Sequence, residues 1–168
     1  MEIVLVTGLV AVIGVIAARF MVSFFDSYNK SKVSVNVENT GRDLLHTFEA
    51  EIRNAKSVSL ESPTQLTIVK QSDEVWSLCW VAKDCAADNS NNFVSFSAQS
   101  GGAFPEIPLT PVNSLSGVNV VSLEFSENNG SIAFEVSLEN ACGLPDKARF
   151  RATSSYKTEI RPRSIYND

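Results

Sequence analysis

The chain contains few of the side chains on which most catalytic and metal sites depend. Its 168 residues include one histidine and three cysteines, with no Gly-x-Ser-x-Gly sequence, no glycine-rich phosphate loop and no paired-carboxylate motif. The single histidine, His46, has no metal-ligating partner near it in the sequence, and we interpret it as a surface or boundary residue of a helix. We therefore predict no catalytic residue, no metal site and no cofactor, and an enzyme is the least favoured class of function.

Positive charge is also scarce. The chain has 14 lysines and arginines against 19 aspartates and glutamates, which gives a net charge of −5 and an isoelectric point near 4.9. Glu2 and Arg19 cancel each other, so the whole net charge belongs to residues 26–168. Because a nucleic-acid binder needs a basic face to meet the phosphates, this balance argues against nucleic acid as a partner.

The first part of the chain lacks both charge and proline. Residues 3–18 are uncharged, and the first proline is Pro63. Of the first 25 residues 19 are apolar, compared with 55 of the remaining 143. The uncharged run would form about 24 Å of helix. Apolar residues beyond Arg19 extend it to about residue 25, which suffices to cross a bilayer if Arg19 reaches towards the headgroups.

Four interpretations of this segment are open. A core helix is disfavoured, because a polar body of this size cannot bury a helix that is apolar on every side. A cleaved signal peptide would fit Ala17 and Ala18, although no basic residues precede the run. A plain single-span anchor explains the length but not Glu2, a carboxylate at the membrane-entering end that is costly without a partner. The fourth interpretation gives Glu2 such a partner.

Residues 2–18 read EIVLVTGLVAVIGVIAA and resemble the N-terminal helix of type IV pilins and type II secretion pseudopilins. The resemblance implies an inner-membrane helix that packs into a filament core with other pilin or pseudopilin subunits and carries a periplasmic or extracellular head. It also implies that Glu2 neutralises the N-terminal amine of a neighbouring subunit. Gly8 and Gly14 would allow close helix packing; the alternative is that they are ordinary transmembrane glycines.

In this family the glutamate is the fifth residue of the mature chain, after a short basic leader that ends in glycine and is removed before N-terminal methylation. Met1 alone precedes Glu2 here, so we expect the leader and the first mature residues to be encoded upstream. Taken alone, Lys30 and Lys32 after the apolar run would indicate the opposite orientation in the membrane.

Residues 26–56 continue the helix with a different pattern. Apolar side chains recur three and four residues apart, which predicts an amphipathic helix; they are Val37, Leu44, Leu45, Phe48, Ile52 and Ala55. Residues 33–37 alternate and by themselves could form a strand, and Gly41 weakens a helix by about 1 kcal/mol, so any bend is expected near Gly41. Residues 38–55 resemble the second half of the long helix in J-type pseudopilins and W-type minor pilins.

From residue 57 the apolar period changes to two, which predicts an antiparallel β-sheet head. The expected strands are residues 57–60, 65–70, 75–82, 118–125, 132–138 and an interrupted 148–160. Asn129-Gly130 predicts a tight hairpin, Pro63 predicts a turn, and residues 83–117 are expected to form one long loop. The order of elements makes the fold α+β, with the long helix packed on the sheet as in the pilin fold.

The three cysteines match no zinc or thioredoxin motif, and a disulfide is expected if the head is exported. We favour a Cys79–Cys85 bridge, which would close a small loop at a strand end; a bridge from Cys142 to either of them, or no bridge, stays open. Trp76 and Trp80 share one face of a strand, and we prefer core packing against the amphipathic helix over an exposed adhesion patch.

The chain is thus expected to have three parts. Residues 1–25 form the transmembrane or filament-core helix, residues 26–56 form its amphipathic continuation, and residues 57–168 form the head. The resemblance implies a structural subunit, minor rather than major, of a type IV pilus-like or type II secretion pseudopilus filament, which sits in the membrane before assembly. The alternative is a membrane-anchored extracytoplasmic binding module with no filament role.

Overall fold

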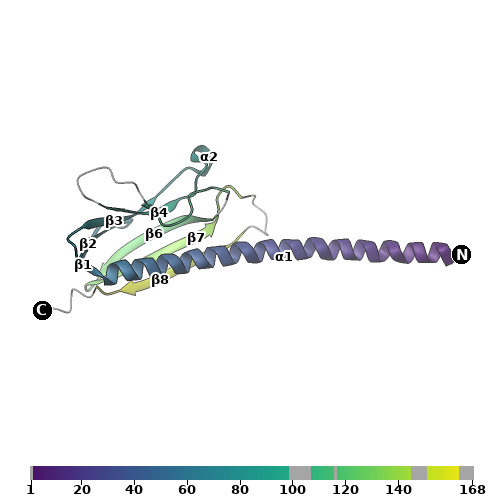
Figure 1. The fold of residues 1–168 in the computed structure, drawn as a ribbon, viewed down its shortest axis with the longest axis horizontal. Helices are drawn as coiled ribbons and strands as arrows, with labels where there is room; N and C mark the ends of the chain where they lie inside the picture. Colours follow the sequence, from purple (N-terminus) through teal and green to yellow (C-terminus); the bar gives the residue numbers. More distant parts are fainter. Residues whose placement is uncertain (1, 99–106, 116, 145–150, 163–168) are drawn as a thin grey trace.

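A computed structural model describes residues 2–98, 107–115, 117–144 and 151–162 of the chain. Its main feature is a single helix, α1 (Glu2–Arg53), of 52 residues, which is about 78 Å long at about 1.5 Å per residue. The second half of α1 lies against a β-rich head, and residues 3–25 project from that head with their described side chains exposed (Figure 1). The fold is therefore α+β, as the sequence predicted.

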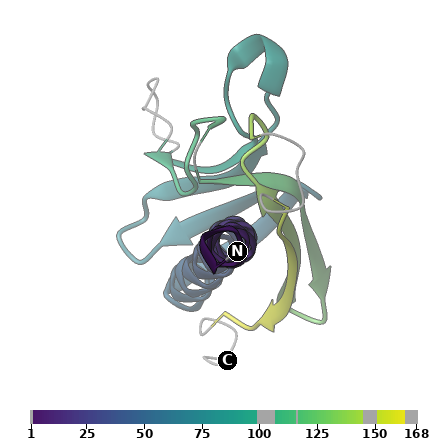
Figure 2. The same ribbon diagram turned by 90° about the vertical axis from the view of Figure 1, so that its right-hand side faces the viewer.

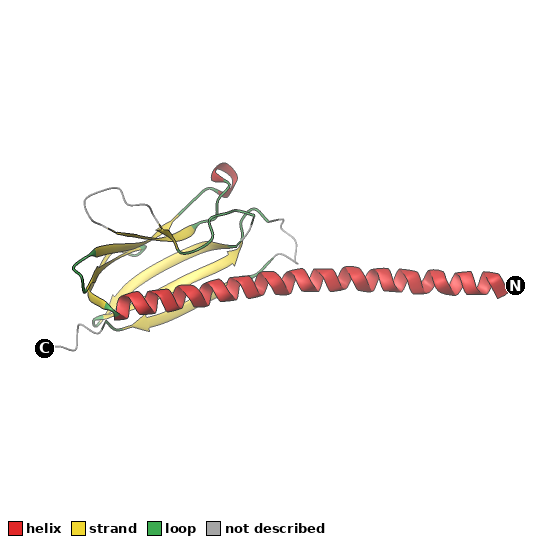
Figure 3. Cartoon of the chain, viewed as in Figure 1, coloured by secondary structure: helices red, strands yellow, loops and turns green. Residues whose placement is uncertain are grey.

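The head contains two antiparallel sheets, where the sequence led us to expect one. The first sheet has the order β1-β2-β3-β4-β5, and the second has the order β6-β7-β8. Figure 3 shows these strands in yellow beside the red helix α1. The first sheet comprises β1 (Ala55–Ser62), β2 (Gln65–Lys70), β3 (Val75–Val81), β4 (Phe93–Ala98) and β5 (Ile107–Pro108). The second comprises β6 (Val118–Asn128), β7 (Ser131–Asn140) and β8 (Thr153–Ile160). The strands are antiparallel, as predicted, but the expectation of one sheet is wrong, because the chain leaves the first sheet after β5.

The predicted boundaries hold best where short-range patterns are strong. Strand β2 has the predicted bounds, whereas α1 ends at Arg53 and β1 begins at Ala55, slightly before the expected change at residue 57. The expected long loop is wrong in part, because it contains β4 and β5 as well as the short helix α2 (Cys85–Asp88). Part of the last predicted strand, residues 148–150, lies outside the described residues, and β8 occupies its second half.

The amphipathic stripe of α1 forms one wall of the hydrophobic core. Val37, Leu44, Phe48 and Ile52 are all almost completely buried, and they belong to one cluster with the inward side chains of both sheets. The ring of Phe48 lies 4.8 Å from that of Phe134 on β7, centroid to centroid. Viewed along the helix, the two sheets curve around one side of α1 (Figure 2), so the helix is shared by both.

Gly41 does not bend the helix; it lets a strand approach it. The helix runs unbroken through Gly41, which is itself buried. A Cβ atom at this position would overlap the ring of Tyr156 on β8. The Tyr156 hydroxyl donates a hydrogen bond of 3.3 Å to the carbonyl oxygen of Glu38. The glycine that weakens the helix therefore serves the contact between α1 and the head.

The Asn-Gly hairpin is confirmed. Asn128 pairs with Ser131, and the two turn residues Asn129 and Gly130 have φ angles of 48° and 76°, as a type I′ turn requires. A bulge in β6 between Val120 and Ser122 leaves Val121 unpaired and exposed. Because a bulge changes which residues face inward, Val118 and Val120 before it and Leu123 and Phe125 after it all reach the core.

Candidate functional site

The candidate functional site is the apolar segment of α1, defined as residues 3–25. Every residue of this segment whose side chain is described is exposed. Fourteen large apolar side chains are among them, with exposed fractions from 55% at Phe25 to 80% at Ile3. They occur on all sides of the helix, so the segment has no polar face to turn towards water.

Such a surface is not stable in water by itself. Full burial of one large apolar side chain contributes roughly 1.5–3 kcal/mol, so covering fourteen of them would contribute on the order of 20–40 kcal/mol. Exposed apolar areas of this size mark sites of contact with a membrane or with other chains. The apolar part of α1 has a mean hydropathy of 2.2 and is long enough to cross a membrane. This fits a single-pass membrane anchor.

The polar groups within the apolar segment are few and suited to an apolar environment. The Thr7 hydroxyl donates to the carbonyl oxygens of Ile3 and Val4, at 2.9 and 3.1 Å, so the hydroxyl needs no outside partner. Arg19 is the one charged residue of the segment, and it lies near its head-proximal end, from which a long side chain can reach the headgroups. Glu2 is in the first turn of α1, at the tip furthest from the head.

Gly8 and Gly14 lie within the apolar segment, and neither position has any other part of the chain within 4 Å. They are six residues apart, so at about 100° per residue they point in directions about 120° apart. Gly14 falls on a stripe of small side chains only about 60° wide, formed with Thr7, Ala11 and Ala18, whereas Gly8 lies outside it. The two predicted packing positions therefore cannot belong to one narrow seam.

The predicted Cys79–Cys85 bridge is wrong. Cys85, at the start of α2, is bonded to Cys142, with their Cα atoms 6.0 Å apart, and Cys79 is free. Cys79 lies within β3, directly across from Ser95 on β4, and its sulfur is 2.9 Å from the Ser95 hydroxyl. This position turns Cys79 towards the neighbouring strand and away from Cys85.

Asn91 holds the segment that carries Cys142, and no signal in the sequence singled it out. Its side chain is completely buried. Its amide nitrogen donates to the carbonyl oxygens of Pro111 and Asn113, and its side-chain oxygen accepts from the backbone N–H of Cys142 at 2.8 Å. A buried asparagine that joins three segments can be recognised only after those segments are in contact.

The two tryptophans of β3 pack against the core, as preferred, but their partners lie on strands and not on the amphipathic helix. Trp76 stacks on Phe96 of β4 with ring centroids 4.6 Å apart. The Lys70 ammonium lies over the Trp76 ring, 4.4 Å from its centroid. The indole N–H of Trp80 donates to the carbonyl oxygen of Val120 on β6 at 3.2 Å. Both side chains thus join sheet elements to one another.

His46 is exposed on α1, where the sequence placed it.

Within residues 2–98, 107–115, 117–144 and 151–162, no three His, Cys, Asp or Glu side chains gather as metal ligands would. The apolar segment of α1 is the candidate site because its described side chains are apolar and exposed. No family model, no curated protein and no solved structure matches the chain.

Proposed function

We propose that the chain is a structural subunit of a pilus-like or pseudopilus-like filament, with the character of a type IV pilin or type II secretion pseudopilin and most like a minor subunit. One observation carries the proposal: α1 is a single unbroken helix whose apolar first half is left uncovered, while its second half is fixed in the head. The subunit uses the bilayer to cover residues 3–25 before assembly and neighbouring helices to cover them afterwards.

Glu2 gives this proposal its specificity over a plain anchor. A carboxylate at the buried tip of an apolar helix is unfavourable unless it is neutralised. In a filament, the N-terminal amine of a neighbouring subunit supplies the opposite charge. Loss of one partner from such a desolvated pair is costly, so the pair also selects the register between neighbours.

The disulfide supports an extracytoplasmic head. Cys85 and Cys142 are far apart in the sequence, and a bridge of this kind persists in oxidising compartments. This orientation places Lys30 and Lys32 on the outer side of the membrane, against the usual bias of positive residues. A basic leader upstream of Glu2 would restore that bias, and the DNA preceding Met1 provides a direct check.

The test compares how much subunit is incorporated into filaments with how much is inserted into the membrane. Glu2→Ala and Glu2→Gln variants are expressed in the source cells, and the amount of subunit in sheared filaments is measured beside the amount that resists carbonate extraction from membranes. We expect both variants to insert normally and to lose most of their incorporation. Unchanged incorporation would refute the charge-pairing role, and a wild-type chain found only as membrane-bound monomer would favour an anchored binding module.

The glycines offer a second test of the same proposal. Gly14→Leu fills the stripe formed with Thr7, Ala11 and Ala18, whereas Gly8→Leu adds the same side chain on another side of the helix. If one closely packed neighbour contacts the stripe, Gly14→Leu should reduce incorporation more strongly than Gly8→Leu. Equal effects would mean that no single side of the helix makes the close contact.

A further inference from the structure

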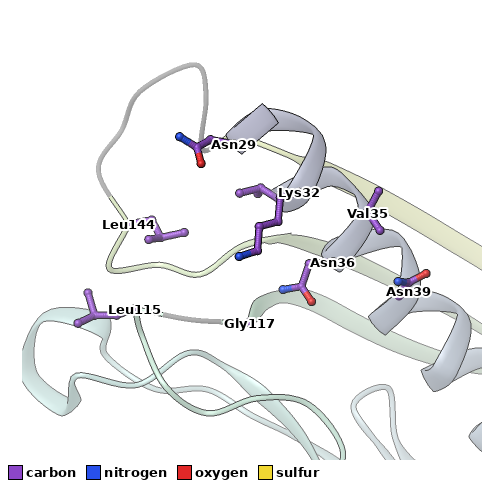
Figure 4. Close-up of a pocket in the computed structure, with 9 residues that line it drawn as sticks. Asn29, Lys32, Val35, Asn36, Asn39, Leu115, Gly117 and Leu144 are labelled. Carbon is purple, nitrogen blue, oxygen red and sulfur yellow. The ribbon is translucent and has the colours of Figure 1, made fainter. Parts of the chain in front are cut away.

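A groove opens where α1 leaves the head on its membrane-proximal side. This neck groove has a volume of about 520 Å³. Its helix wall includes Asn29, Lys32 and Asn36, and its head wall includes Leu115, Gly117 and Leu144. Figure 4 shows Lys32 and Asn36 extending from α1 towards the loops that carry Gly117 and Leu144.

The two walls of the neck groove differ in chemistry. Lys32 supplies an ammonium group and Asn36 supplies amide N–H donors, and neither has an ion pair or side-chain hydrogen bond within the described part of the chain. None of the described lining residues is acidic. Opposite them, Leu115 is 61% exposed and presents an apolar side chain. The groove thus offers a cation and amide donors beside an apolar wall, which suits an amphiphilic anion.

The end of the groove nearest the apolar segment lies at the level of the headgroup layer of a bilayer. Asn29, Lys32 and Asn36 lie about 6, 10 and 16 Å beyond Phe25, the last residue of the apolar segment. The headgroup layer on each side of the hydrocarbon is about 5–8 Å thick. Because side chains on a helix lean towards its N-terminus, those of Asn29 and Lys32 lean back towards this layer.

We propose that the neck groove binds the phosphate headgroup of an anionic phospholipid while α1 is inserted in the membrane. The Lys32 ammonium, on a side chain long enough to reach back, and the Asn29 amide meet the phosphate oxygens, and Leu115 and Leu144 contact the glycerol and the start of the acyl chains. This inference rests on the membrane-inserted state of the proposed function. It adds that the head is held against the bilayer by a lipid, which must be released when the subunit leaves the membrane.

The chain offers a matched pair of variants to test the lipid site. Lys30 and Lys32 are both exposed lysines close to the membrane, but Lys30 lies about 200° further round the helix and does not line the groove. The full-length protein, as wild type, Lys30→Gln and Lys32→Gln, is reconstituted in phosphatidylcholine vesicles containing a minority of phosphatidylglycerol. Each is then extracted in mild detergent, and retained phosphatidylglycerol is counted by native mass spectrometry.

We expect Lys32→Gln to lower phosphatidylglycerol retention about five-fold or more, and Lys30→Gln to lower it less than two-fold. Equal losses of phosphatidylglycerol in the two variants would mean that only the general surface charge matters, and would overturn the site. No loss in either variant would overturn it as well. Displacement of the lipid by equimolar glycerol 3-phosphate would assign the groove to soluble phosphate esters instead. Retention of a second protein copy in place of lipid would also overturn it.

Carbonate extraction of the same vesicles separates the two proposals. A chain that fails to insert contradicts the proposed function and removes the basis of the lipid site with it. A chain that inserts firmly, but retains no more phosphatidylglycerol than Lys32→Gln does, contradicts the lipid site alone.

Discussion

The apolar segment of α1 (residues 3–25) and its head-packed segment (residues 37–52) differ in what covers their side chains. In the apolar segment every described side chain is exposed, whereas Val37, Leu44, Phe48 and Ile52 are almost fully buried. Both belong to one helix with an unbroken backbone. The same secondary structure is therefore stabilised by the chain's own head in one half and needs an outside environment in the other.

This difference follows from the arrangement of apolar residues around the helix. A stripe repeating every three to four residues leaves one polar face, which the head-packed segment turns to water. The apolar segment has no such face, so no single sheet could cover it. Among apolar side chains of α1, only those in the second half should therefore lower the stability of the head when they are removed.

The largest effect is expected from Phe48→Ala. Phe48 packs against Phe125 and Phe134 in the centre of the core, and removal of a buried phenylalanine side chain costs about 3–5 kcal/mol. Its counterpart in the apolar segment, Phe20→Ala, should change the unfolding free energy of the head by less than about 0.5 kcal/mol. Guanidinium unfolding of the full chain in detergent, monitored by tryptophan fluorescence, measures the unfolding free energy of both variants. Similar losses would contradict the division of α1 into two segments.

Removal of the disulfide should have the next largest effect. The bridge joins residues 57 positions apart, and replacing both Cys85 and Cys142 by serine should destabilise the head by about 2–4 kcal/mol. Cys79→Ser replaces the thiol beside the Ser95 hydroxyl by a hydroxyl that can form the same hydrogen bond, and it should cost less than about 1 kcal/mol. Thermal unfolding measures the stability of the wild type, the double serine variant and Cys79→Ser. Non-reducing peptide mass spectrometry of the wild type identifies the linked cysteines. A Cys79–Cys85 peptide, or three free thiols, would contradict the structure.

A smaller effect is expected from Gly41→Ala. The new methyl group would overlap the Tyr156 ring, and overpacking of this kind costs about 1–3 kcal/mol. Gly14→Ala, in the apolar segment, meets nothing within 4 Å and should leave the head unchanged.

The Tyr156→Ala background is the control for this clash. There, Gly41→Ala should cost nothing or stabilise the protein by up to about 1 kcal/mol, because alanine is the better helix former. A double-mutant cycle gives the coupling, and a coupling near zero would show that Tyr156 does not require the glycine.

The smallest effect is expected on the outer face of the head-packed segment. Arg42 and Glu38 form an ion pair of 2.6 Å, but both side chains are more than half exposed. Arg42→Gln should lower the unfolding free energy by about 0.3–0.5 kcal/mol, and the difference should disappear in high salt. A loss above about 1 kcal/mol that persists in salt would mean that the outer face also contributes to the core.

Features that depend on neighbouring residues in the sequence could be predicted. The Asn129-Gly130 turn, strand β2 and the stripe of α1 all follow from local backbone preferences or from a repeat of fixed period. Strand β4 was within reach as well, since Val94, Phe96 and Ala98 alternate, but it lies in a stretch rich in turn residues.

Features that depend on distant residues could not be predicted. Cys85 pairs with Cys142, which lies in the turn after β7, and Asn91 of the α2–β4 loop holds that turn through the Cys142 backbone N–H. The purpose of Gly41 depends on a tyrosine in the last strand. Within the candidate site, the exposed apolar surface could be read from the run itself, whereas the different directions of Gly8 and Gly14 become evident only once the helix is known to be continuous.

By itself, the sequence determined that this chain has an uncharged apolar helix, an amphipathic continuation and a β-rich acidic head, because charge, periodicity and turn residues act over a few positions. The tertiary structure alone decided that the head has two sheets, that Cys85 pairs with Cys142, and that α1 emerges from the head beside a polar groove. These depend on which surfaces meet after the chain folds. Contact energies between residues far apart in sequence carry no signature in the local pattern of either one.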